Sequence, residues 1–160
     1  MYKHIIMKNK LIKNLCIIIV SFKSKTKTLK LIKKIDQSIE VIIVENSQDK
    51  NLKVLIEKEY KNIKVLIPTH NNGFSWSFNL AVKKTNKKYI MYLDTDIIVQ
   101  GDLMNIFNEP IEDKLYGMKE GTIEHEIHGG WWFDFTTIDK NTVAMNGGIL
   151  LFKPTESTRG

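Results

Sequence analysis

The sequence predicts an α/β fold with a mainly parallel central sheet that is covered by helices on both faces. Two observations carry this prediction. Short apolar runs alternate along the chain with segments whose apolar residues recur at helical spacing. The runs are almost continuously apolar, which is typical of strands buried on both faces of a parallel sheet. No linker, repeat or low-complexity tract interrupts this alternation, so residues 1–160 are expected to form a single domain.

Four apolar runs are predicted to be strands, at residues 14–21, 41–44, 64–67 and 87–93. The first follows several lysines and therefore looks like a signal peptide. However, no small-residue cleavage site follows it, and it is too short to cross a bilayer. We therefore interpret it as the first buried strand.

Three helices are expected between these strands, and each has an apolar side. Thr26 or Thr28 is predicted to cap the first helix. In the second helix, Lys53, Glu57 and Lys58 are expected to face solvent. The inward positions are expected to be Leu31, Ile32 and Ile35 in the first helix, Leu52, Leu55, Ile56 and Tyr60 in the second, and Phe74, Phe78, Ala81 and Val82 in the third.

The composition excludes some functions. The formal net charge is +6, but Arg159 is the only arginine and the lysines are spread along the whole chain. Arginine side chains, which recognise bases through paired hydrogen bonds, are therefore almost absent from the chain. We expect no nucleic-acid partner for this reason. The positive charge suits a phosphorylated donor or peripheral association with acidic lipids. Cys16 stands alone in an apolar run, which predicts a buried cysteine in a reducing, cytoplasmic compartment.

Asp94 and Asp96 follow directly after the fourth predicted strand. In an open α/β sheet, ligands bind at the carboxyl ends of the strands, and the turns at Ser21, Glu45 and Asn71 are expected at the same edge. Two carboxylates this close repel each other unless a cation is near, and their oxygens suit Mg²⁺ or Mn²⁺ shared with substrate phosphates. The alternative is a surface turn, where aspartate is common.

The stretch before residue 136 holds further candidates. Trp131 and Trp132 follow a glycine pair and are predicted to form an aromatic platform for a ligand, while the alternative is a hydrophobic plug on the sheet. Asp134 or Glu126 is a candidate general base. The histidines near Glu126 lack the spacing of a helical zinc pair, so a separate metal site is not expected there.

Four short motifs occur in order over residues 15–99: Val-Ser-Phe-Lys at 20–23, Val-Glu-Asn-Ser at 44–47, Asn-Asn-Gly-Phe at 71–74 and Leu-Asp-Thr-Asp at 93–96. Together they resemble the large inverting glycosyltransferase family 2, which includes rhamnosyl and polysaccharide glycosyltransferases. The resemblance implies a Rossmann-like GT-A fold. It also implies a donor site formed by Ser21, Glu45, Asn46, Asn71, Gly73 and Asp94, with a metal at Asp94 and Asp96.

The second half of the chain resembles a different family. The stretches 93–103 and 145–154 are similar to the retaining glycogenin-like and lipopolysaccharide galactosyltransferase family 8. This resemblance implies that Asn146 and Gly147, ahead of a strand, line the sugar pocket. One family transfers its sugar with inversion of the anomeric configuration and the other with retention. Both outcomes therefore stay open for this chain.

The resemblance implies transfer of a sugar from a nucleotide diphosphate, with uridine as the first expectation, to a glycan, lipid or protein acceptor with Mn²⁺ or Mg²⁺. Under this resemblance, Trp131 and Trp132 are the platform for the acceptor, and Asp134 or Glu126 is the base that deprotonates its hydroxyl. The later catalytic residues of both families have no counterpart after Pro154. A truncated enzyme, a compact minimal enzyme and a donor-binding domain without turnover are all compatible with this. A haloacid-dehalogenase-type phosphatase, with Asp94 as nucleophile, is the rival enzyme class.

Overall fold

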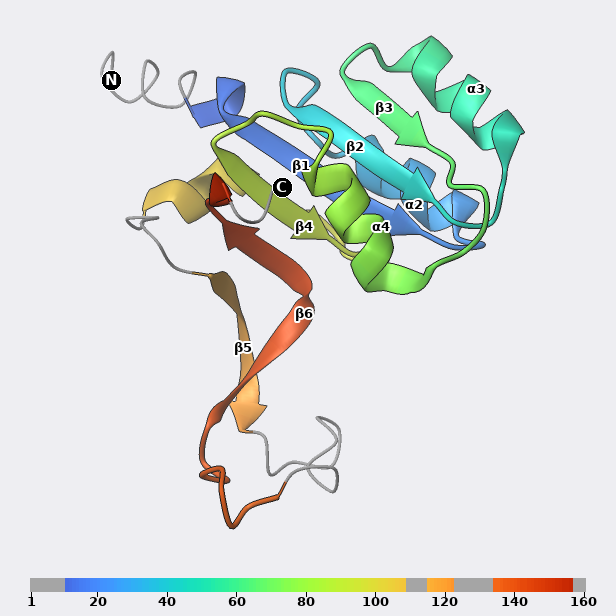
Figure 1. Cartoon of the computed structure of the whole chain (residues 1–160). Helices are drawn as coiled ribbons and strands as arrows, with labels where there is room; N and C mark the ends of the chain where they lie inside the picture. Colours follow the sequence, from blue (N-terminus) through green and yellow to red (C-terminus); the bar gives the residue numbers. More distant parts are fainter. Residues whose placement is uncertain (1–10, 109–114, 123–133, 157–160) are drawn as a thin grey trace.

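A computed structural model of the chain describes residues 11–108, 115–122 and 134–156. These residues contain a six-stranded sheet in the order β3-β2-β1-β4-β6-β5 (Figure 1). Its strands are β1 (Leu15–Ser21), β2 (Glu40–Glu45), β3 (Ile63–Leu66), β4 (Tyr89–Leu93), β5 (Tyr116–Thr122) and β6 (Val143–Phe152). The helices are α2 (Lys25–Ile32), α3 (Lys50–Glu59), α4 (Gly73–Val82) and the 3-10 helix η1 (Leu103–Asn108). The predicted α/β fold with a mainly parallel sheet is confirmed.

The first four strands all run parallel, and β1 lies at the centre of the sheet. After β1 the chain adds β2 and β3 on one side, then returns to place β4 on the other. The strand order therefore reverses between β1 and β4. In open α/β sheets, such a switch point leaves a crevice at the carboxyl ends of the two strands.

Alternating side chains of the strands build two cores. The larger core lies on the face covered by α2 and α3 and includes Ile17 and Ile19 of β1. The smaller core lies beneath α4 and includes Cys16 and Ile18. A sheet buried on both faces explains why the strands read as continuous apolar runs.

Most of the predicted inward positions of the helices are confirmed. Leu31, Ile32, Ile35, Leu52, Ile56, Tyr60, Ala81 and Val82 are buried. Two predictions are wrong, because Leu55 is 43% exposed and Phe74 is 46% exposed. Leu55 is next to Ile56 along α3, and only one of two neighbouring helical positions faces the sheet here. Phe74 is in the first turn of α4 and has its ring edge against Tyr92, with 5.0 Å between ring centroids.

The predicted cap of α2 is also wrong. Ser24 is the residue at its N-cap, and Thr28 lies within the helix. The Thr28 hydroxyl is buried and donates to the carbonyl of Ser24 at 3.1 Å. Thr28 therefore attaches the first turn of the helix to the loop that follows β1.

Lys53 and Glu57 do not simply face solvent as predicted. The Glu57 carboxylate accepts from the backbone N–H of Val65 at 2.8 Å and from the Lys53 ammonium at 2.9 Å. Burial raises the pKa of Glu57, but these hydrogen bonds outweigh it and leave the pKa lowered. Since β3 is an edge strand, Glu57 satisfies a backbone donor that the sheet leaves unpaired.

Strands β5 and β6 form an arm that extends away from the other strands (Figure 1). Only Ile149–Phe152 of β6 pair with β4, in antiparallel register. Near the bend, Gly117 of β5 pairs with Leu150, whereas the next residue, Met118, pairs with Asn146. Residues 147–149 are therefore extra on the β6 side, as in a bulge. Asn146 and Gly147 lie inside this bent strand, and the prediction that they precede a strand is wrong.

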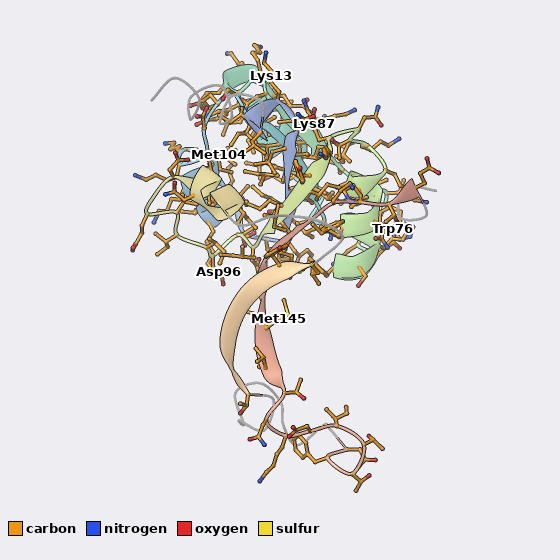
Figure 2. The ribbon with its side chains drawn as sticks, turned by 90° about the vertical axis from the view of Figure 1, so that its left-hand side faces the viewer. Lys13, Trp76, Lys87, Asp96, Met104 and Met145 are labelled. Carbon is orange, nitrogen blue, oxygen red and sulfur yellow. The ribbon has the colours of Figure 1, made fainter. Side chains whose placement is uncertain are left out.

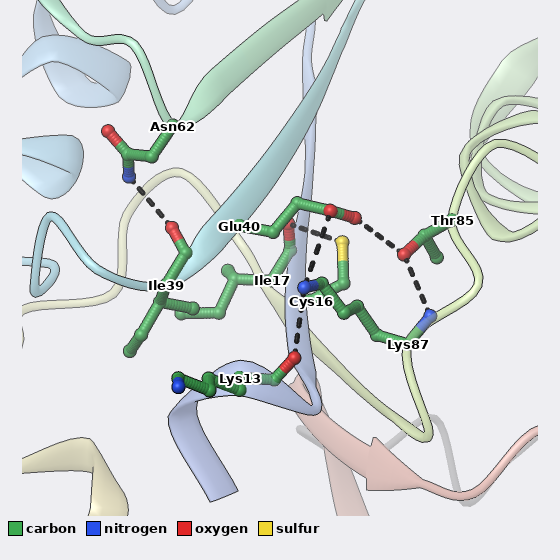
Figure 3. A network of polar contacts seen from close by, with 8 residues as sticks. All are labelled: Lys13, Cys16, Ile17, Ile39, Glu40, Asn62, Thr85 and Lys87. Atoms are coloured by element: carbon green, nitrogen blue, oxygen red, sulfur yellow. Dashed lines mark hydrogen bonds and ion pairs between the residues drawn. The ribbon is translucent and has the colours of Figure 1, made fainter. Parts of the chain in front are cut away.

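A polar network links the amino-terminal ends of strands β1, β2 and β4 (Figure 3). Thr85 donates to Glu40 at 2.6 Å, and the Lys87 ammonium donates to the carbonyl of Lys13 at 2.9 Å. Figure 2 shows Lys13 and Lys87 at one end of the sheet and Asp96 at the other. Cys16 is buried as predicted, and burial, together with the charge of Glu40, raises the pKa of its thiol to about 12.

Within the described residues, no helix is both long and apolar enough to cross a membrane.

Candidate functional site

The carboxyl ends of β1, β2 and β4 bring Ser21, Glu45 and Asp94 to one edge of the sheet. Ser21 pairs with Glu45 in the register of β1 and β2, and the N–H of Asn46 donates to the Ser21 carbonyl at 2.8 Å. Asp94 follows the neighbouring strand across the switch point. These three residues therefore lie at one edge of the sheet, as the sequence predicted.

Asp94 is held by hydrogen bonds to its own turn and to β6. Its backbone N–H donates to the carbonyl of Gly148 at 2.8 Å, and its carboxylate accepts from the N–H of Thr95 at 2.7 Å. The side chain is half-buried. Burial raises the pKa of the nearby Tyr92, and the charge of Asp94, a hydrogen bond to it, and the charge of Asp96 add to this effect. The Tyr92 hydroxyl thus keeps its proton beside the two acids.

Asp96 faces solvent, two residues further on. Its carboxylate lies 3.8 Å from the Lys27 ammonium of α2, and both side chains are 61% exposed. An ion pair this exposed typically contributes only about 0–1 kcal/mol to stability. A ligand can therefore displace Lys27 from Asp96 at little cost in free energy. Asp96 is therefore the more accessible of the two acids.

The two acids fit a divalent metal that shares its ligands with a substrate. Among the described residues, no group of three or more His, Cys, Asp or Glu side chains is close enough to hold an ion alone. Asp94 and Asp96 supply hard carboxylate oxygens, which Mg²⁺ and Mn²⁺ prefer. Magnesium sites commonly use one or two carboxylates and complete the shell with substrate phosphates and water. The donor set suits such a shared site.

Ser21 is fully buried, and its hydroxyl is engaged by the loop and helix that follow β1. Its hydroxyl lies 3.1 Å from the hydroxyls of both Ser24 and Thr28. The side chain therefore fixes the loop between β1 and α2, while the backbone beside it borders the crevice.

Glu45 is only 1% exposed, and its carboxylate is engaged by the loop that follows it. One oxygen accepts from the N–H of Ser47 at 3.2 Å and from the Ser47 hydroxyl. The other accepts from the N–H of Asp49 at 2.8 Å. Ser47 in turn accepts from the N–H of Lys23 at 3.1 Å, which links the two loops. Glu45 thus organises the edge of the site, and its role in contacting a nucleotide base stays a prediction.

Replacing Glu45 with alanine is expected to lower the free energy of unfolding by about 3 kcal/mol. The change leaves the N–H groups of Ser47 and Asp49 without their acceptor, and a buried unsatisfied donor costs about 1–3 kcal/mol. Denaturant unfolding measures the loss. Glu59→Ala, which removes an exposed acid at the end of α3, is the control and should cost under about 0.5 kcal/mol. Equal losses in the two variants would contradict this role for Glu45.

Asn46, Asn71 and Gly73 shape the start of α4. Asn46 is 4% exposed and accepts from the Ser77 hydroxyl of α4 at 2.9 Å. Asn71 is exposed, and its side chain accepts from the N–H of Gly73 at 2.9 Å. Gly73 has a φ of +81°, in the left-handed region that favours glycine. These contacts hold the N-terminus of α4 at the same edge as Asp94.

Gly148 is a residue of this site that the sequence analysis missed. Its carbonyl accepts from Asp94, and its N–H donates to the Asn146 side chain at 2.7 Å. A Cβ atom at Gly148 would lie 2.8 Å from Asn146 Oδ1, 3.3 Å from Ile97 Cδ1 and 3.7 Å from Asp94 Cβ. A Cβ atom at Gly147 would meet nothing within 4 Å. The consecutive glycines inside an apolar run were the available signal, because glycine in a strand often marks a bulge or a close approach.

Asp134 is not brought near Asp94. It precedes β6 in the segment 134–142, at the far end of the arm (Figure 1). Its carboxylate accepts from the N–H and the hydroxyl of Thr136 at 2.9 and 2.6 Å, and these hydrogen bonds lower its pKa. A lowered pKa makes a weaker base. Three other predicted site residues lie outside the described residues: Glu126, Trp131 and Trp132.

Solved structures share the fold. A mannosyltransferase from Pyrobaculum calidifontis, solved with GDP-Man and Mn²⁺, matches 88% of this chain and 44% of its own, with a TM-score of 0.55 and 13% identity. The apo form of the glycosyltransferase GlyE from Streptococcus pneumoniae TIGR4 matches 91% of this chain and 34% of its own, with a TM-score of 0.55 and 12% identity. Residues 1–349 of S. aureus TarS match 59% of this chain and 31% of their own, with a TM-score of 0.51 and 18% identity. The chain thus spans less than half the length of each of these structures.

The sequence itself also matches a family. No curated protein matches the chain. The pattern described as glycosyl transferase family 2 matches residues 16–138, which includes the four motifs at the carboxyl edge. The stretch 93–103, which resembled family 8, lies inside this match, and no comparison supports a family 8 part. The fold is accordingly of the GT-A type. Since the match covers more than half of the sequence, the chain belongs to glycosyl transferase family 2.

Proposed function

We propose that this chain binds a nucleotide-diphosphate sugar at the carboxyl edge of its sheet and acts as a glycosyltransferase. One observation carries the proposal. In a chain of family 2, Asp94 and Asp96 follow the strand that borders the switch point of the sheet. Nucleotides bind at such switch points in open α/β sheets.

The crevice between β1 and β4 is the proposed donor site. Its border would consist of the loop after Ser21, the Asn46 turn, the Asn71–Gly73 turn and Asp94. The backbone donors at the start of α4 suit an anionic diphosphate. The mannosyltransferase with a similar fold was solved with GDP-Man and Mn²⁺, which supports a nucleotide sugar and manganese here. The preference for uridine rests on the family resemblance alone and stays a prediction.

Asp94 and Asp96 are the residues that would hold Mn²⁺ or Mg²⁺. When bound, such an ion offsets the negative charge that develops on the nucleoside-diphosphate leaving group. The chain's own part is to hold the two acids at the carboxyl edge, where the carbonyl of Gly148 fixes the backbone of Asp94. An ion at Asp96 would displace Lys27 from its weak contact with this acid. The freed ammonium would then add positive charge close to the diphosphate.

The sugar of the donor is proposed to lie beside Asn146 and Gly147. Both belong to the bend of β6, next to the residue that accepts from Asp94. The space above Gly147 is open, which leaves room for a sugar ring. No described residue is assigned the role of base, because Asp134 lies at the other end of the arm. The acceptor, a glycan, lipid or protein, and its platform at Trp131 and Trp132 stay predictions.

Donor hydrolysis tests this function. The chain is incubated with UDP-sugars and GDP-sugars, with and without Mn²⁺, and the released nucleoside diphosphate is measured. Manganese-dependent release supports the transferase. Donor binding without any release would mean a binding domain. Release of phosphate from small phosphoesters, lost in Asp94→Asn, would replace the proposal with a phosphatase.

A further inference from the structure

We propose that α2 and residues 96–99 form a surface that docks on an anionic lipid bilayer. We call this surface the lysine face; its lysines would contact lipid phosphates, and Ile98 would enter the apolar part of the bilayer. This binding does not depend on the proposed transferase activity.

The lysine face carries a dense row of cations. Helix α2 and the turn after it contain five exposed lysines and no acidic residue: Lys25, Lys27, Lys30, Lys33 and Lys34. Lys27 contacts Asp96. Among the described residues, no ion pair involves Lys30, Lys33 or Lys34. Within the described part of the chain, these three ammonium groups therefore have no acidic partner.

The same surface is apolar between its lysines. A groove of about 500 Å³ separates α2 from the segment after β4, and its apolar lining consists of Leu31, Ile97, Ile98 and Val99. Ile98 is 80% exposed, the highest value among the large hydrophobic side chains that the structure describes. Ile98 is not an isolated case, because it adjoins the apolar groove, and contiguous apolar surface rimmed by polar residues is typical of an interaction site.

A bilayer surface matches both properties at once. Acidic headgroups attract lysines, while the acyl region accepts an aliphatic side chain, and lysine stems reach along apolar surface to place their charges at the headgroups. A nucleic acid matches less well, because the lysine face contains neither arginine nor an aromatic ring for base stacking. The positive charge of the lysines and the apolar lining of the groove together therefore favour an anionic bilayer as the partner.

Docking in this way would turn the proposed donor site toward the membrane. Lys27 lies both in the groove and 3.8 Å from Asp96, so the lysine face adjoins the acidic pair directly. An acceptor carried at a membrane surface would then be presented at the carboxyl edge of the sheet.

Flotation of the full chain with vesicles tests the lysine face. The vesicles contain phosphatidylcholine alone or with about one third phosphatidylglycerol, and the chain should bind only the second kind, less tightly at high salt. The variant with Lys30→Gln, Lys33→Gln and Lys34→Gln should bind about 100-fold more weakly, since each lysine near an anionic surface contributes roughly fivefold. Ile98→Ser should lower the affinity about tenfold and leave the salt dependence unchanged.

The matched control removes the same charge from the other face of the sheet. Lys61, Lys64 and Lys84 are exposed and line a separate pocket with Ile42, beneath α4 rather than α2. Changing these three to glutamine lowers the net charge from +6 to +3, six minus three, as the first variant does. The control should keep its affinity within about threefold, and thermal unfolding confirms that both variants fold.

Equal losses in the two triple variants would show that overall charge and not this surface binds the lipid. No binding of the unchanged chain to the anionic vesicles would also overturn the proposal. If the chain instead formed a dimer that Ile98→Ser dissociates, and bound no vesicles, the lysine face would join two copies of this chain.

Discussion

Changing Asp96 to asparagine is expected to weaken manganese-dependent donor binding by about 100-fold, the largest effect of any single substitution considered. The carboxylate is exposed at the carboxyl edge, and its ion pair within the described part of the chain is the weak one with Lys27 at 3.8 Å, so it contributes little to stability. Loss of residues that merely support metal ligands typically costs 10–100-fold in affinity, so loss of a ligand should reach about the upper end. Titration of the nucleotide sugar by calorimetry, with and without Mn²⁺, measures the change.

Asp139→Asn is the matched control for this substitution. It removes the same charge from an exposed turn at the far end of the arm, where the carboxylate accepts from the backbone N–H and the side chain of Asn141. Donor affinity should be unchanged in this control, and both variants should unfold near the temperature of the unchanged chain. An Asp96→Asn variant that binds the donor as tightly as before would remove Asp96 from the proposed site.

The second large effect is expected at Gly148. Its replacement by alanine places a Cβ atom 2.8 Å from Asn146 Oδ1, so the Asn146 side chain has to move and gives up its hydrogen bond to the residue 148 N–H. We expect a loss of about 2 kcal/mol in the free energy of unfolding, since overpacking and a lost hydrogen bond each cost about 1 kcal/mol. Donor affinity should also fall, by about tenfold, because Asp94 is held by the carbonyl of this residue.

Gly147→Ala separates crowding from a role in the sugar pocket. A Cβ atom there meets nothing within 4 Å, so stability should stay within about 0.5 kcal/mol. If the sugar lies against Gly147 as proposed, turnover should nevertheless fall in this stable variant. Denaturant unfolding and donor hydrolysis are measured on both variants, and a stable Gly148→Ala with unchanged donor affinity would contradict the close packing inferred here.

Strands β1, β2 and β4 were predictable because each is apolar on both faces, whereas β5, with the sequence YGMKEGT, carries no such pattern and was not predicted. Runs such as Val41–Val44 leave no polar residue to face solvent, so a sheet covered on both sides was the simplest packing. The edge position of Glu45 and Asp94 followed from the same reasoning, because parallel strands end together. Local sequence was sufficient for these features.

The actual contacts of the site residues were not predictable in the same way. Ser21 and Glu45 looked like residues that face a ligand, yet their side chains bond to the loops beside them. The approach of Gly148 to Asp94 joins residues 54 positions apart (148 minus 94), across an antiparallel pair. Helical and strand periodicity carry no information about such pairing.

The exposed apolar residues show the same limit. Leu55 fits the apolar side of α3 by spacing alone, but it is 43% exposed because Leu52 and Ile56 already fill the contact with the sheet. Ile98 belongs to the apolar stretch 97–99 and is nevertheless 80% exposed. How much of a helix or loop is buried against the sheet depends on how the neighbouring elements pack. The spacing of apolar residues in the sequence does not specify that packing.

The most direct test of the central claim is the binding of Mn²⁺ at the carboxyl edge, followed through the electron paramagnetic resonance signal of the free ion. With a nucleoside diphosphate present, UDP or GDP, the free-ion signal should fall as the chain is added, since Asp94 and Asp96 share the ion with the diphosphate. Without the nucleotide the ion should bind weakly, because the described residues contain no group of three or more His, Cys, Asp or Glu side chains that could hold it. A signal that does not respond to the nucleotide, or that falls equally with Asp96→Asn, would contradict the proposed donor site.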